Sequence, residues 1–91
     1  MQADSEKIDL DMMRYLASPE YHRGWLKSIE RTMKKYVEAG IPAKNRNTRL
    51  LFESRREELQ EAEENGCISP RRFRKYISQV DEVEHKALLS S

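Results

Sequence analysis

Apolar residues recur along much of the chain at the three- and four-residue spacing of an amphipathic α-helix. Over residues 19–39, one side of such a helix carries the apolar residues and the opposite side carries the charged ones. The apolar side consists of Tyr21, His22, Trp25, Leu26, Ile29, Met33, Tyr36 and Val37. Residues 70–89 repeat the pattern with Phe73, Tyr76, Ile77, Val80, Val83, Ala87 and Leu88. These two segments are predicted to form most of the core.

Turn-forming residues divide the chain into four predicted helices, at about residues 5–17, 19–39, 43–65 and 70–89. Asp4 or Ser5 is a candidate N-cap for the first helix. No segment shows the alternating pattern of a strand. The sequence therefore predicts one all-α domain spanning residues 1–91, a small antiparallel bundle of three long helices and a shorter N-terminal helix.

The predicted helix ends rest on two local signals. The Ser-Pro pairs at 18–19 and 69–70 each place a capping serine before a proline at the first helical position. Gly40 and Gly66 follow the second and third helices, where a residue with positive φ commonly ends a helix.

The third predicted helix begins with Leu50, Leu51 and Phe52, which are consecutive. At about 100° per residue they span about 200° of the helix surface, so one packing contact cannot bury all three. Burial of such side chains contributes about 1.5–3 kcal/mol each, which favours a covered cluster. The cover is either the N-terminal helix or another protein chain.

If another chain covers the cluster, Leu50, Leu51 and Phe52 form the apolar centre of a protein-contact surface with Arg46 and Arg49 around it. This hypothesis predicts that Leu50 or Phe52 is poorly buried in the monomer, and that the partner is either a second copy or a different protein.

Charge alternates in blocks along the chain. Residues 51–65 have a net charge of −4, and residues 66–76 have a net charge of +4. The positive block consists of Arg71, Arg72, Arg74 and Lys75, at a helix start where the helix dipole favours anions. One interpretation is that these cations pair across the turn with the acids that end the preceding helix. The other is that they bind an anion, including nucleic acid.

The segment around this turn resembles a DNA-binding helix-turn-helix motif, with Ala62, Gly66 and Ser69 at the spacing A-x-x-x-G-x-S before a basic helix. The turn is one residue longer than is usual in that motif. The resemblance implies, as an alternative function, a small DNA- or RNA-binding regulator that uses the last helix.

Composition narrows the remaining classes. The chain is 36% charged, has a net charge of +1 and contains one cysteine, Cys67, which excludes an internal disulfide. His22, His85 and Cys67 are too scattered for a zinc signature or a nucleophile pair, so we expect no enzyme activity, metal or cofactor.

The acidic N-terminus is unlike a signal peptide, and no apolar run is long enough to span a membrane. The expected location is cytoplasmic, or nuclear in a eukaryote. The favoured function is a non-catalytic protein-interaction module, an adaptor or inhibitor that acts alone or as a homodimer.

Overall fold

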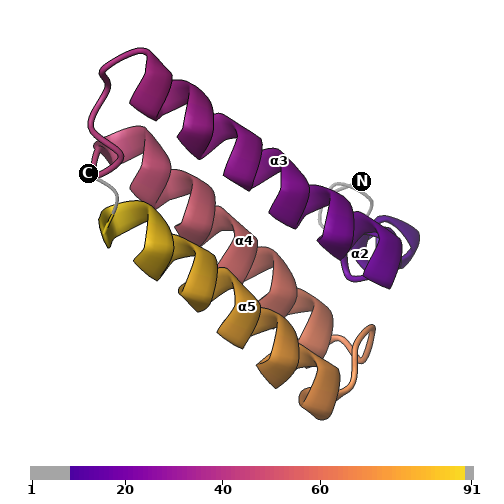
Figure 1. Cartoon of the computed structure of the whole chain (residues 1–91). Helices are drawn as coiled ribbons and strands as arrows, with labels where there is room; N and C mark the ends of the chain where they lie inside the picture. The colour runs from indigo at the N-terminus through magenta and orange to yellow at the C-terminus, as the bar shows by residue number, and fades with distance from the viewer. Residues whose placement is uncertain (1–8, 90–91) are drawn as a thin grey trace.

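The computed structural model describes residues 9–89, which form four helices (Figure 1). They are α2 (Leu10–Leu16), α3 (Pro19–Glu38), α4 (Arg46–Glu64) and α5 (Pro70–Leu89). The part of the chain described contains no strand, so the predicted all-α class is confirmed. The candidate caps Asp4 and Ser5 lie outside the described residues, and α2 begins after Asp9, whose side chain accepts a hydrogen bond from the Met12 amide.

Side-chain caps start the long helices. Ser18 Oγ accepts from the Tyr21 amide at 3.2 Å, and Ser69 Oγ accepts from the Arg72 amide at 3.1 Å, as the two Ser-Pro pairs predict. Helix α4 begins three residues later than expected, because Asn45 caps it by accepting from the Thr48 amide at 2.9 Å.

Glycine ends α3 and α4 in the same way. Gly40 and Gly66 have φ of 72° and 74°, a conformation that costs glycine little. After α4, the amides of Gly66 and Cys67 donate back to the carbonyls of Glu63 and Ala62. The same two bonds follow α3, and together they define the Schellman motif that closes a helix.

The three long helices run up, down and up (Figure 1). The start of α4 and the end of α5 line one hollow, so these two helices form an antiparallel hairpin. Arg56 of α4 crosses the hairpin to bind Asp81 and Glu84 of α5. Helix α3 lies along the hairpin and is parallel to α5, while α2 packs on α4 and α3 at one end. The Cα trace measures 48 × 32 × 17 Å, which is a flattened shape.

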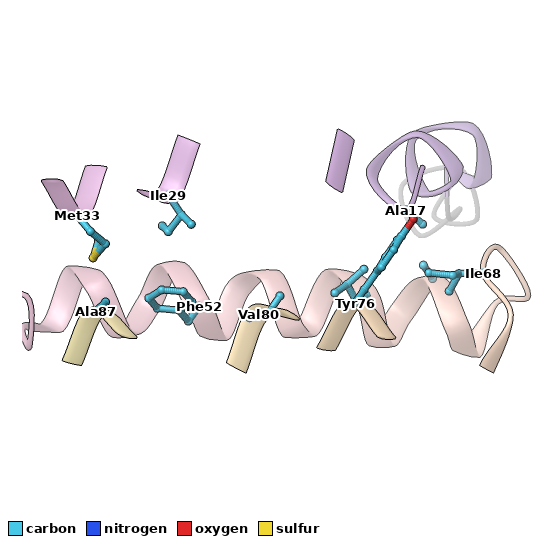
Figure 2. Close-up of a cluster of buried hydrophobic side chains, with 10 residues drawn as sticks. Ala17, Ile29, Met33, Phe52, Ile68, Tyr76, Val80 and Ala87 are labelled. Atoms are coloured by element: carbon cyan, nitrogen blue, oxygen red, sulfur yellow. The ribbon is translucent and has the colours of Figure 1, made fainter. Parts of the chain in front are cut away.

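The core runs along the line where α3 meets the hairpin (Figure 2). Phe52 and Leu59 of α4 and Val80 of α5 have no exposed surface. Ile29 and Met33 of α3 pack over them, and Trp25 meets Phe52 edge-to-face with ring centroids 5.9 Å apart. The core is filled by the predicted faces of α3 and α5 together with Phe52 and Leu59 of α4, of which Phe52 had been predicted to belong to the contact surface.

Candidate functional site

The cluster at the start of α4 is divided by the fold. Phe52 is fully buried, and in this structure it has no surface to offer a partner. Leu50 and Leu51 remain 46% and 38% exposed. Their helical phase predicted that one packing contact cannot bury all three residues, and the structure agrees. Phe52 must therefore be removed from the predicted contact surface.

Helix α2, the described part of the predicted N-terminal helix, does not cover the two exposed leucines. The last carbonyl of α2, that of Leu16, accepts a hydrogen bond from Arg55, one helical turn further along α4. Leu50 and Leu51 instead line a shallow hollow of about 400 Å³ together with Tyr36 of α3. We call Tyr36, Leu50 and Leu51 the α4 surface. Within the described residues, nothing covers it.

The two arginines of the predicted surface lie beside the leucines rather than around them. Arg46 and Arg49 are exposed and line a different hollow, which faces the end of α5 near Glu84. Arg46 precedes Leu50 by four residues, so the two side chains are neighbours along the helix. Arg49 approaches Glu53 at 3.8 Å across solvent, a pair that adds little stability.

Within the described residues, the cations at the start of α5 form no ion pair with the acids that end α4. Among residues 9–89, no ion pair within 4 Å joins Arg71, Arg72, Arg74 or Lys75 to a carboxylate. Arg71, Arg72 and Lys75 line a hollow of about 540 Å³ between α3 and α5, and Arg23 of α3 lines it too. We call this the basic hollow. Arg74 does not line it.

The α4–α5 hairpin differs from a helix-turn-helix. That motif joins its two helices at about 90–120° and uses the second one to enter a DNA groove. Here the two helices run antiparallel and side by side over their length (Figure 1). The Ala-Gly-Ser spacing instead belongs to the closing turn of α4 and the serine cap of α5. The helix-turn-helix form of the nucleic-acid hypothesis therefore does not fit this fold.

A buried polar chain centred on Arg55 was not predicted. The Arg55 side chain has no exposed surface and donates to the Leu16 carbonyl at 2.8 Å and to Glu58 Oε1 at 2.9 Å. A third bond goes to His22 Nδ1 at 3.0 Å. The guanidinium also lies 5.0 Å from the centre of the Tyr21 ring and 5.6 Å from that of Trp25. Only its Nε lacks a partner. The hydrogen bonds of Arg55 thus join α2, α3 and α4.

The Arg55 bond determines which proton His22 carries. Because a guanidinium can only donate, His22 Nδ1 accepts, and Nε2 carries the hydrogen that is donated to Gln79 Oε1 at 2.8 Å. The ring stacks on Tyr76 at 3.7 Å between centroids. Burial, then the charges of Arg55 and Lys75, lower the pKa of His22 below 6.5, although the Gln79 bond acts in the opposite direction. His22 is therefore a neutral core residue at pH 7.

The sequence pattern indicated only part of this buried hydrogen-bond network. The arc of α3 placed His22 on the buried side, and Arg55 lies one turn before Leu59 on the buried side of α4. A charged residue on a buried helix face is the signal that could have identified Arg55, because such a residue must find partners inside.

The described residues hold no group of three histidine, cysteine, aspartate or glutamate side chains able to bind a metal ion. No helix in that part of the chain is both long enough and apolar enough to cross a membrane. Comparisons of the chain with protein-family models, curated proteins and solved structures found no match.

Proposed function

We propose that this chain is a non-catalytic interaction module that binds another protein chain through the α4 surface. The observation that carries the proposal is the exposure of two adjacent leucines, Leu50 and Leu51, beside Tyr36. Single exposed leucines are common and need no explanation. Two adjacent leucines next to a tyrosine form a contiguous apolar patch, and tyrosine is enriched at interface centres.

The partner that this face fits is a second copy of the chain. Along the exposed side of α4, Arg46 and Arg49 precede the leucines, and Glu53 and Glu57 follow them. Two α4 helices laid antiparallel across a two-fold axis would bring the basic end of each to the acidic end of the other, with the leucines between them. A two-fold interface requires such a self-complementary patch.

The chemistry of the surface favours binding over catalysis. Residues 46–57 contain neither histidine nor cysteine, so the hydroxyl groups of Thr48 and Ser54 have no imidazole base within that segment. An adaptor or inhibitor needs only such a complementary contact.

Sedimentation velocity over a range of concentrations tests the proposal. We expect a dimer whose dissociation constant rises at least about tenfold in Leu50→Lys, because a charge then replaces an apolar anchor. The matched control is Leu10→Lys, at a leucine of 40% exposure on α2, which should leave the constant unchanged. A monomeric wild type, or equal effects of both variants, would refute the assignment.

A charge exchange tests the antiparallel arrangement. The variants Arg46→Glu/Arg49→Glu and Glu53→Arg/Glu57→Arg should each dimerise poorly, because like charges would then face each other. A mixture of the two should form a heterodimer, since the ends are again opposite in sign. A mixture no more associated than its components would exclude this arrangement.

A further inference from the structure

We propose that the basic hollow between α3 and α5 binds a small phosphorylated molecule. Four cationic side chains from two helices line it: Arg23 of α3, and Arg71, Arg72 and Lys75 of α5. The hollow lies beside the start of α3, whereas the α4 surface lies beside the end of α3 at Tyr36. The inference is therefore independent of the proposed protein-binding function.

Within the described residues, no carboxylate forms an ion pair with the charges of the hollow. All four cations are exposed, and no ion pair or side-chain hydrogen bond engages any of them within residues 9–89. The described residues that line the hollow include no carboxylate. Like charges gathered around one concave site repel each other and concentrate a positive potential there. A bound anion would remove this repulsion.

The hydrogen-bond donors match a phosphate group. Arginine forks and lysine ammonium groups both bind phosphate oxygens, and the arginines do so with two parallel bonds. Gln79 also lines the hollow. Since its Oε1 accepts from His22, its amide nitrogen is left with two N–H donors that no described residue engages. The hydrogen bonds that run from Arg55 through His22 to Gln79 thus fix the Gln79 side chain so that its amide N–H groups are available as donors.

The charge pattern of the groove limits the size of the ligand. Further along the same α3–α5 groove, the next hollow is lined by Glu30 and Glu82 as well as Lys34 and Lys86. The purely positive region is therefore confined to the basic hollow. A nucleic-acid strand is held through successive phosphates and needs a continuous basic track. A hollow of about 540 Å³ instead has the size of a small-molecule site.

Isothermal titration with pyrophosphate, combined with amide chemical-shift mapping, tests the proposal in the full chain. We expect one pyrophosphate per chain, with shifts concentrated in residues 19–26 and 69–79. Arg72→Gln should weaken binding at least about tenfold through the loss of a charge-assisted pair. The matched control is Arg74→Gln, which removes the same charge two residues away, outside the hollow, and should weaken binding far less. Circular dichroism melting verifies that both variants fold.

Three results would overturn the proposal. Equal weakening by the two variants would show only a general response to net charge. The absence of saturable binding at millimolar pyrophosphate would exclude a phosphate site. A single-stranded oligonucleotide that binds more tightly than pyrophosphate, with an affinity that falls steeply with salt, would assign the cations to nucleic acid instead.

Discussion

At the scale of single residues, Arg55 shows how a charge can be accommodated in a small core. Its three hydrogen bonds and two aromatic neighbours replace the water that it lost on folding. Burial of a cation without such partners would cost several kcal/mol. The geometry suits a planar fork with several donors, which lysine does not provide.

We expect Arg55→Lys to lower the free energy of unfolding by about 1–3 kcal/mol, because a single ammonium cannot reach all three acceptors. Urea denaturation monitored by circular dichroism measures the change. Arg71→Lys, at an exposed site, should shift stability by less than about 0.5 kcal/mol. Equal stability of Arg55→Lys and the wild type would contradict the role given to the buried fork.

His22 predicts the direction of a pH effect on stability. Its pKa is lowered in the folded protein, so below pH 6.5 the unfolded chain binds a proton more readily than the folded chain does. The stabilisation from neutral His22 is thus complete above pH 6.5 and is lost as pH falls toward the folded pKa. In chemical denaturation at pH 7 and pH 5, His22→Gln should lose less stability than the wild type between the two values. An identical loss in both proteins would show that His22 is not responsible.

From the sequence, the burial of single residues could be predicted only from their angular position around each helix. The arc of α3 correctly placed His22, Ile29 and Met33 inside. The same method could show that Leu50, Leu51 and Phe52 point in different directions, but it could not show which of them faces α3 and α5. That choice depends on where the neighbouring helices pack, which a single helix does not encode.

At the scale of elements, glycine has opposite effects at two positions. Gly24 lies inside α3, and a Cβ added there would meet no atom within 4 Å. Gly66 ends α4 with a φ of 74°, which side chains adopt only with strain.

The same substitution should therefore change stability in opposite directions. Gly24→Ala is expected to stabilise the protein by about 0.5–1 kcal/mol, because alanine loses less conformational entropy in a helix. Gly66→Ala is expected to destabilise it by about 1 kcal/mol or more, because the left-handed conformation is then strained. Thermal melting of the two variants beside the wild type measures both changes, and a shift of equal sign would contradict this account.

Helix ends could be predicted where the signal is local. The Ser-Pro pairs and the glycines gave the starts of α3 and α5 and the closing turns of α3 and α4, since each acts within four residues. The start of α4 was less certain because Asn45, Asn47 and Thr48 are all capable caps, and only Asn45 is used. The cluster of cations at the start of α5 could be predicted from the sequence. Its position beside Arg23 could not, because that position requires α3 to run parallel to α5.

At the scale of the whole molecule, the bundle is broader and thinner than its size requires. The Cα radius of gyration is 14.9 Å, compared with about 12 Å for a compact domain of this length. Helix α3 has an open hollow on both sides, one toward α5 and one toward α4. Near its end, Val37 is 56% exposed, and Ile41 just after it is 44% exposed.

The end of α3 is less well packed than the rest of the bundle, and this affects the order in which parts of the molecule unfold. Beyond Met33, α3 packs on the core through the partly buried Tyr36 alone, whereas the α4–α5 hairpin is closed by Phe52, Leu59, Val80 and the Arg56 ion pairs. In native-state hydrogen exchange, the amides of residues 34–38 should therefore exchange by local opening, while those around Leu59 and Val80 should exchange only through global unfolding. Uniform protection across the three long helices would mean that α3 and the hairpin separate in a single step.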